Sequence, residues 1–99
     1  MIRVSLDKGT VAHHTLRVRQ YHHQVLMLVD DKAIILDTPA AVNAGLSLAT
    51  FAGQAQGSEI VSFKYNGETL NLLPHQARQL AGALIKKADL ADDFQRKIA

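Results

Sequence analysis

The sequence contains no cysteine and no tryptophan, and its only aromatic residues are two tyrosines and three phenylalanines. The lack of cysteine excludes a disulfide scaffold, a thiolate zinc site and a cysteine nucleophile. A cysteine-free chain also suits a reducing compartment, where disulfides do not form.

Long hydrophobic runs are absent as well. The amino-terminal stretch has no apolar segment long enough for a signal peptide. The longest uncharged stretch, residues 38–58, is too polar to cross a bilayer, because it is interrupted by Pro39, Asn43, Ser47, Gln54 and Gln56. We therefore expect a soluble, cytoplasmic protein that does not act at a membrane.

The excess of charge is small, with eleven basic and nine acidic residues and a net charge of +2. It is concentrated in residues 1–24. This segment has one acidic residue, Asp7, and four basic residues: Arg3, Lys8, Arg17 and Arg19. A chain of 99 residues suits one domain, so we take residues 1–99 as a single domain.

The most informative pattern is an internal repeat. Residues 24–53 and 59–88 align without a gap at a spacing of about 35 residues, the scale of supersecondary repeats. In this alignment Pro39 lies over Pro74, and Asp31-Lys32 lies over Asn66-Gly67. Few residues are identical, so the similarity is one of pattern: strand, tight turn, strand, proline, helix.

Local signals predict each element of this unit. Asn66-Gly67 is a strong two-residue hairpin signal, and Asp30-Asp31-Lys32 is a weaker version of it. Pro39 and Pro74 are placed at the first helical position, with Thr38 as the cap of the first helix. The first helix is expected over residues 39–53, and the second from Pro74, with fraying expected from Asp92 onward.

Two more strands are expected before the repeat, because residues 2–6 and 15–21 alternate between apolar and polar side chains. A turn is predicted at residues 7–10, which would pair these two strands. The predicted fold class is α+β, in the order ββββα-ββα. It consists of one antiparallel sheet of about five to six strands with two helices on one face.

The first helix carries no charge, and it has a stripe of small residues at four-residue spacing, formed by Ala41, Gly45, Ala49 and Gly53. Small side chains let another backbone approach closely. One interpretation is a central helix packed on the sheet and on the second helix. The other is that its outer side contacts a protein partner or a second copy, since an uncharged helix is usually buried all round. The second interpretation predicts a homodimer.

Catalytic and metal-binding patterns are missing. The histidine pairs His13-His14 and His22-His23 cannot each chelate one ion, because adjacent residues of a strand point to opposite faces. There is no Gly-x-Ser-x-Gly elbow and no glycine-rich phosphate loop. We therefore predict no catalytic residue, no metal site and no cofactor.

Nucleic-acid binding is the more specific hypothesis. Arg17, Arg19 and Tyr21 line one face of a predicted strand, with Arg3 expected on the neighbouring strand and His23 at its end. Cations for phosphate and a ring for stacking are what recognition of single strands uses. The alternative is that this face is polar only because one face of a sheet meets water.

The predicted function is therefore a small non-enzymatic protein–protein interaction module. Its size and missing motifs favour an accessory or inhibitory factor of a phage or other mobile element. The alternative is a sequence-tolerant, single-stranded nucleic-acid binding protein that uses the basic and aromatic sheet face.

Overall fold

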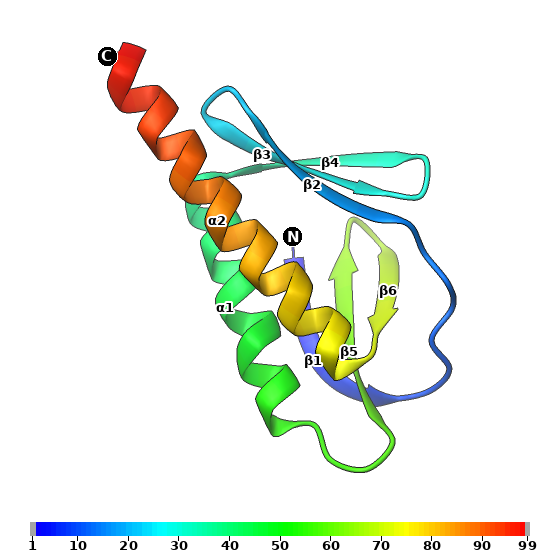
Figure 1. Ribbon diagram of the computed structural model, residues 1–99. Helices are drawn as coiled ribbons and strands as arrows, with labels where there is room; N and C mark the ends of the chain where they lie inside the picture. The colour runs from blue at the N-terminus through cyan, green and yellow to red at the C-terminus, as the bar shows by residue number, and fades with distance from the viewer. Residues whose placement is uncertain (1, 99) are drawn as a thin grey trace.

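The structure, a computed structural model, describes residues 2–98 and contains six strands and two helices (Figure 1). Their order matches the predicted ββββα-ββα. In chain order they are β1 (Ile2–Lys8), β2 (Leu16–Tyr21), β3 (Gln24–Val29), β4 (Lys32–Asp37), α1 (Thr38–Gln54), β5 (Glu59–Tyr65), β6 (Glu68–Leu72) and α2 (Pro74–Ile98). No helix within the described range is long and apolar enough to cross a membrane.

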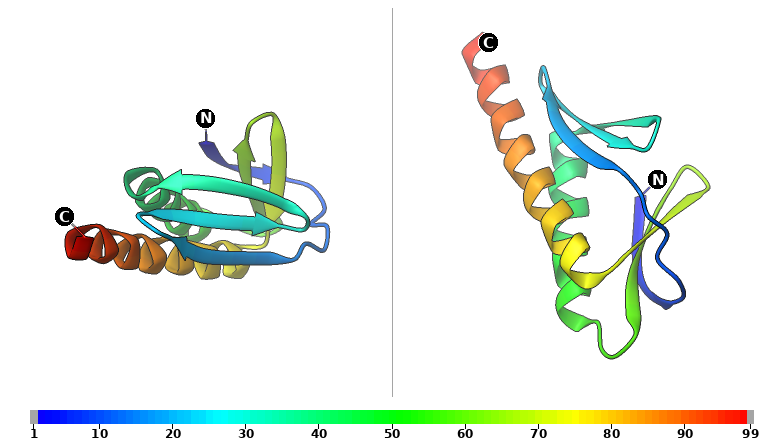
Figure 2. Two further views of the ribbon diagram at one scale, coloured as in Figure 1. Left: turned by 90° about the horizontal axis from the view of Figure 1, so that it is seen from above. Right: turned by 45° about the vertical axis from the view of Figure 1, so that its right-hand side comes forward.

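The strands form two antiparallel sheets of three strands each, in the orders β1-β5-β6 and β2-β3-β4. The prediction of one sheet of five to six strands is therefore wrong. The two helices pack side by side along one side of the molecule, and the two sheets lie on the other side (Figures 1 and 2).

The error began at the predicted turn over residues 7–10. Asp7 and Lys8 continue β1, and residues 9–15 form a connection of seven residues that leads to β2 in the other sheet. β1 instead pairs with β5, with Ile2 opposite Tyr65 and Lys8 opposite Glu59. Alternation along a strand shows which side chains share a face, but it does not identify the neighbouring strand.

The tight turns agree with their residue types. Asn66 and Gly67 both have positive φ angles, 46° and 81°, as the predicted two-residue turn requires. Asp30 also has a positive φ, 54°, in the weaker predicted turn. A further two-residue turn at His22-His23, where His22 has a φ of 54°, joins β2 to β3. Each hairpin register is fixed by its turn.

Both helices are capped by side chains. The Asp37 carboxylate accepts a hydrogen bond from the Ala40 N–H (2.9 Å), so Asp37, and not Thr38 as predicted, is the cap of α1. At the start of α2, the Gln76 side chain accepts from the Leu73 N–H (3.0 Å), one half of a capping box.

The second helix continues past the point where fraying was predicted. Ala91 is fully buried, and the ring of Phe94 lies 5.7 Å from the ring of His22 in the β2–β3 turn. These contacts give the last turns of α2 a packing surface. The helix therefore extends to Ile98.

One hydrophobic core joins all the layers. The inner residues of both sheets, including Val25, Met27, Phe63 and Leu70, pack in a single cluster with residues of both helices. Gly45 lies at a close approach of the two helices, because a Cβ built there would lie 2.8 Å from Ile85 Cγ1 of α2. The side chain of Lys32 in β4 also pairs with that of Glu68 in β6, which links the two sheets.

Both units of the predicted repeat form a hairpin followed by a helix: β3-β4-α1 and β5-β6-α2. The two hairpins belong to different sheets. Shared element order does not establish a duplication, so the internal repeat stays a prediction.

Candidate interaction surfaces

The outer face of the β2-β3-β4 sheet, which points away from the core, combines arginines with aliphatic side chains. The register places Arg17, Leu28 and Ala33 side by side in one row across the sheet, and Arg19, Leu26 and Ile35 in the next. We call this surface the open face and define it by Arg17, Arg19, Tyr21, Leu26, Leu28, Ala33 and Ile35.

The open face is accessible. Ile35 is 54% exposed and Tyr21 is 48% exposed, both unusually high for large apolar side chains. Leu26 and Leu28 are half-buried in the centre of the sheet, whereas Arg17 and Arg19 are exposed along one edge. The face thus has an apolar centre with a cationic rim on the β2 side.

Within the part of the chain that the structure describes, the cations of this rim form no ion pair. The ion pairs formed among residues 2–97 are His14–Asp30, Lys32–Glu68 and Asp93–Arg96, and none of them includes Arg17 or Arg19. Both guanidinium groups therefore remain available to an anion from outside.

The outer face of the other sheet has a different chemistry. Its rows are Arg3–Lys64–Thr69 and Ser5–Ser62–Asn71. We call these six residues the polar face. Ser62 is fully buried, and its hydroxyl donates to Asn71 Oδ1 (2.9 Å), while Asn71 Nδ2 donates to the Thr10 carbonyl (3.4 Å). The connection at residues 9–15 therefore covers part of this face.

The position of Arg3 corrects one predicted site. Arg3 was expected beside Arg17 and Arg19, but it lies on the polar face opposite Lys64, in the other sheet. Arg17, Arg19 and Tyr21 do share one exposed face of β2, as predicted. His23 is exposed in the turn next to Tyr21.

Hydrogen bonds with Asp30 hold the end of the connection between the sheets, residues 9–15, in place. The Asp30 carboxylate accepts hydrogen bonds from the Thr15 N–H (3.0 Å) and from His14 Nδ1 (2.8 Å), and its own N–H donates to the Thr15 carbonyl (2.8 Å). The His14 hydrogen bond, followed by that of Thr15, holds the pKa of Asp30 below its ordinary value of 3.8.

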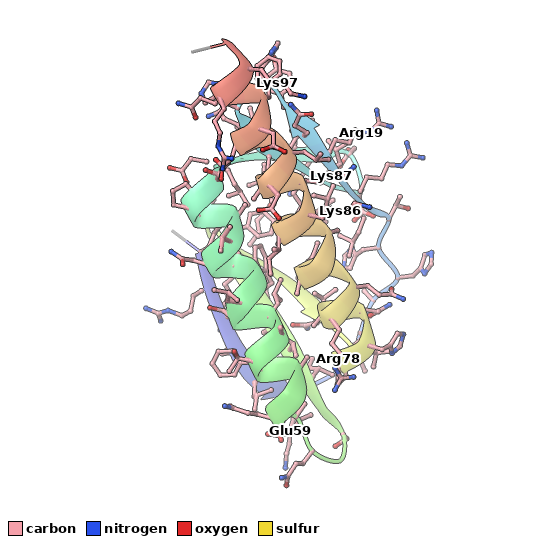
Figure 3. All side chains as sticks on the ribbon, turned by 60° about the vertical axis from the view of Figure 1, so that its left-hand side comes forward. Arg19, Glu59, Arg78, Lys86, Lys87 and Lys97 are labelled. Atoms are coloured by element: carbon pink, nitrogen blue, oxygen red, sulfur yellow. The ribbon has the colours of Figure 1, made fainter. Side chains whose placement is uncertain are left out.

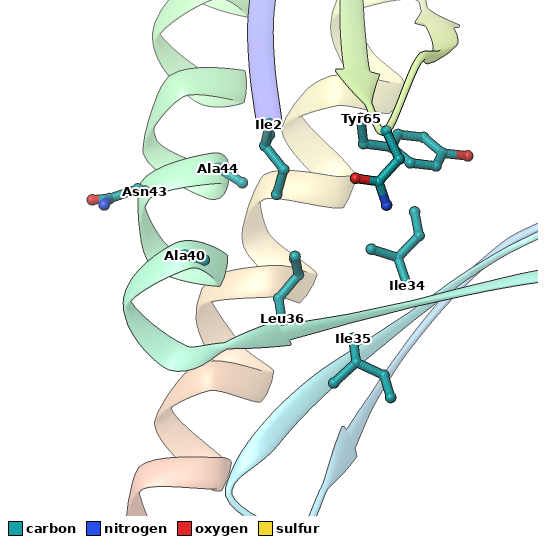
Figure 4. Close-up of a pocket in the computed structure, with 9 residues that line it drawn as sticks. Ile2, Ile34, Ile35, Leu36, Ala40, Asn43, Ala44 and Tyr65 are labelled. Atoms are coloured by element: carbon teal, nitrogen blue, oxygen red, sulfur yellow. The ribbon is translucent and has the colours of Figure 1, made fainter.

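An open groove of about 420 Å³ runs between the edge of β4 and the ends of β1 and β5 (Figure 4). No charged side chain is among its lining residues, which are Ile2, Ile34, Ile35, Leu36, Ala40, Asn43, Ala44, Tyr65 and Asn66. Burial, and then the negative charge of Asp30, raises the pKa of Tyr65 above its ordinary value of 10.0, in keeping with the apolar wall it contributes.

The small-residue stripe of α1 is divided between the interior and the surface. Ala41 and Gly45 are buried, and Gly45 contacts α2, whereas Ala49 and Gly53 are exposed. Residues four apart on a helix turn by about 40° relative to one another, so a four-residue stripe drifts around the helix. The single chain therefore leaves the outer side of α1 uncovered, where Leu46 is also exposed, and the predicted contact of this side with a partner or a second copy stays a prediction.

The histidines do not gather into a metal site. Within the described residues there is no group of three or more histidine, cysteine, aspartate or glutamate side chains placed to hold a metal ion. His14 pairs with Asp30, and His22 packs between the rings of Tyr21 and Phe94.

The sequence interpretation missed the apolar half of the open face. Leu26, Leu28 and Ile35 were not singled out, although a usable signal was present. Residues 25–29 are apolar without interruption, whereas a strand with one solvated face alternates. Such a run indicates that both faces of the strand favour burial.

Comparisons with known proteins find no match. No family model fits the chain, and no curated protein or solved structure is significantly similar to it. The proposals that follow therefore depend on the surfaces of this molecule alone.

Proposed function

We propose that this protein is a small non-enzymatic protein–protein interaction module that binds its partner through the open face. The observation that carries the proposal is the combination of an accessible aliphatic centre with unpaired arginines at its rim. Contact surfaces have this composition, with an apolar centre, a polar rim and enrichment in arginine and aromatic residues.

The apolar centre provides a driving force for association. Leu26 and Leu28 are already half-buried, and Ile35 is more than half exposed, so a partner would remove mainly the isoleucine and the upper parts of the leucines from water. Full burial of one such side chain is worth about 1.5–3 kcal/mol. Three adjacent side chains can thus form the centre of a contact surface.

The rim indicates the chemistry of the partner. Arg17 and Arg19 stand on one edge of the open face without an acidic neighbour in an ion pair. A matching surface would present aliphatic or aromatic side chains flanked on one side by carboxylates. Such charge complementarity increases the association rate and fixes the orientation of the complex.

The test is a pulldown with tagged protein from host lysate, split into nuclease-treated and untreated halves. We expect a stoichiometric protein band that survives nuclease and is lost with Leu28→Lys. Thr69→Lys, the matched change on the polar face, should retain the band. A band that both variants retain, or the absence of any stoichiometric protein band, would contradict the proposal. Identification of the captured protein would then show whether this chain is a cytoplasmic accessory or inhibitory factor of a mobile element.

Self-association is a second form of the same function. The outer side of α1 is uncharged and exposes Leu46 at 55%. Sedimentation of the wild type and of Leu46→Arg tests whether two copies meet there. A dimer that Leu46→Arg converts to a monomer would support this form, and a monomeric wild type would contradict it.

Single-stranded nucleic-acid binding is the other candidate, favoured by one observation. Arg17, Arg19 and Tyr21 share the open face, and α2, which packs against β2, adds Lys86, Lys87 and Lys97 on the side seen in Figure 3. Against it, Tyr21 is the only aromatic ring on the open face, and the other central positions are aliphatic.

Salt dependence separates these two candidates. For nucleic-acid binding, the affinity for a fluorescent oligothymidine should fall steeply with salt, and it should weaken in the double variant Arg17→Ala/Arg19→Ala. Tyr21→Leu should weaken binding further through loss of base stacking. An affinity that is indifferent to salt and to the arginines would exclude this candidate.

A further inference from the structure

β4 is an edge strand whose outer side is unpaired. In the sheet order β2-β3-β4, only β3 lies beside β4. Among residues 2–98, the backbone of β4 is hydrogen-bonded to β3 and to no further strand. A strand in this position presents a row of free N–H and C=O groups to its surroundings.

The register identifies which groups are free. Val29 and Lys32 flank the two-residue turn, and such a closing pair exchanges both of its backbone hydrogen bonds. Because bonded and non-bonded pairs alternate, Ile34 and Leu36 also bond to β3. The N–H and C=O groups of Ala33 and Ile35 therefore point away from β3.

The opposite edge of the same sheet is protected. β2 carries Arg17 and Arg19 and lies beside α2, whose Gln76 and Gln79 line the space between them. Charged side chains on an edge strand are a common defence against unwanted strand pairing. On β4 the only cation, Lys32, stands at the end of the strand and is paired with Glu68.

The free edge borders the apolar groove. Ile34 and Leu36 point from β4 toward Ile2 of β1, whereas Ile35 points to the other side of the sheet (Figure 4). A segment hydrogen-bonded to Ala33 and Ile35 would direct alternate side chains into this groove, because successive residues of a strand face opposite sides.

We infer that the β4 edge binds an extended peptide segment of a partner protein, which adds to the sheet as a fourth strand and places alternate apolar side chains in the groove. The free backbone groups select an extended backbone, because only a strand can satisfy a row of them. The lining has no charged side chain and is mainly apolar, with Asn43 and Asn66 as its polar amides, so it favours apolar residues at every second position. This inference goes beyond the proposed function, because it concerns the free backbone groups of Ala33 and Ile35 and the groove beside them, and not the side chains of the open face.

A segment fits this edge better than a second copy of the chain does. The β5–β6 hairpin lies next to β4, because its residues Tyr65 and Asn66 line the groove with Ile34 and Leu36 and its Glu68 pairs with Lys32. A second molecule whose whole sheet continued from β4 would have to pass this hairpin. A single extended segment needs only the width of one strand.

The experiment uses a phage-displayed library of seven-residue peptides, selected against the full chain. We expect enriched peptides with apolar residues at alternate positions. A synthetic peptide of the enriched sequence should bind Ala33→Pro at least tenfold more weakly than the wild type, because proline removes one of the free N–H groups while it keeps a small apolar side chain on the open face. Gln20→Pro, in which proline replaces an outward N–H of the protected edge, should bind normally.

Hydrogen exchange of the wild type gives a second readout that does not depend on any variant. The amide protons of Ala33 and Ile35 should exchange at least tenfold more slowly when the peptide is bound. Failure to enrich alternating apolar peptides, unchanged affinity in Ala33→Pro, or unchanged exchange at these amides would overturn the inference. A wild-type dimer that Ala33→Pro dissociates would overturn it in favour of a second copy. Loss of the lysate partner with Leu28→Lys but not with Ala33→Pro would leave the proposed function standing without this inference.

Discussion

The two sheets contain three strands each and face the same pair of helices, yet their outer faces differ in chemistry. The polar face of β1-β5-β6 carries serines, an asparagine, a threonine and two cations, and the Ser62–Asn71–Thr10 hydrogen bonds tie it to residues 9–15. The open face of β2-β3-β4 carries four aliphatic side chains in its central and β4 positions, and within residues 2–98 its Ile35 stays more than half exposed.

The polar face is hydrogen-bonded to other parts of the same chain, whereas the open face leaves aliphatic side chains exposed to water. Polar side chains at the surface meet water or each other at little cost, so the polar face needs no partner. Exposed aliphatic side chains grouped together are disfavoured in water unless something covers them. The open face is therefore the better candidate for contact with another molecule.

The largest expected effect is on partner binding. Leu28→Lys places a charge at the centre of the open face, and we expect at least about a 30-fold loss of affinity for the partner, or about 2 kcal/mol. Thr69→Lys on the polar face should change affinity by less than about twofold. Titration of the captured partner checks both values, and equal losses would remove the distinction between the faces.

A smaller effect is expected on the stability of the polar face. Asn71→Ala leaves the buried Ser62 hydroxyl without its acceptor and frees the Thr10 carbonyl, so the free energy of unfolding should fall by about 1–3 kcal/mol. The double variant Ser62→Ala/Asn71→Ala should recover part of this loss. Urea denaturation measures it, and an unchanged stability in Asn71→Ala would show that the polar face is not held by this network.

Two glycines of α1, Gly45 and Gly53, allow a matched comparison of a packed position with an open one. Gly45→Ala should lower the free energy of unfolding by about 1–3 kcal/mol, because its Cβ would approach Ile85 Cγ1 to 2.8 Å and the Ala81 carbonyl to 3.0 Å. Gly53→Ala meets nothing within 4 Å and should stabilise by up to about 1 kcal/mol through helix propensity. Thermal unfolding compares them, and equal shifts would contradict the close packing of α1 on α2.

The smallest expected effect is on the pKa of Asp30, which is hydrogen-bonded to His14 and Thr15 at the end of the connection between the two sheets. The pKa of Asp30 is lowered in the folded chain, so its stabilising contribution is present above 3.8 and is lost as the pH falls through the lower folded value. His14→Ala should move the Asp30 midpoint up toward 3.8. NMR titration of the Asp30 carboxyl carbon measures both midpoints, and an identical midpoint in the variant would show that His14 does not set it.

Much of the secondary structure could be predicted from local signals. Asn66-Gly67 specifies its hairpin, and Pro39 and Pro74 mark the starts of the helices, because these residues restrict their own backbone angles. The cap of α1 was misplaced by one residue, since both Asp37 and Thr38 are good capping residues and only the helix geometry shows which side chain reaches the Ala40 N–H.

The candidate site could be predicted only in part. Alternation along residues 16–21 is sufficient to place Arg17, Arg19 and Tyr21 on one face. It could not place Arg3, because the partner of β1 is β5, more than fifty residues later in the chain. Nor could it show that Leu26 and Ile35 complete the face beside Arg19, since that requires the register of three strands.

The sequence by itself determined the order and type of the eight elements, the turns at residues 30–31 and 66–67, and the shared face of Arg17, Arg19 and Tyr21. These features depend on neighbouring residues and on short-range backbone preferences. The tertiary structure alone decided that the strands form two sheets and that β4 is left with a free edge. It also decided that one outer face is polar and tied to residues 9–15 while the other is apolar and open. Those outcomes depend on which distant strands pair, and pairing is set by the packing of the whole core.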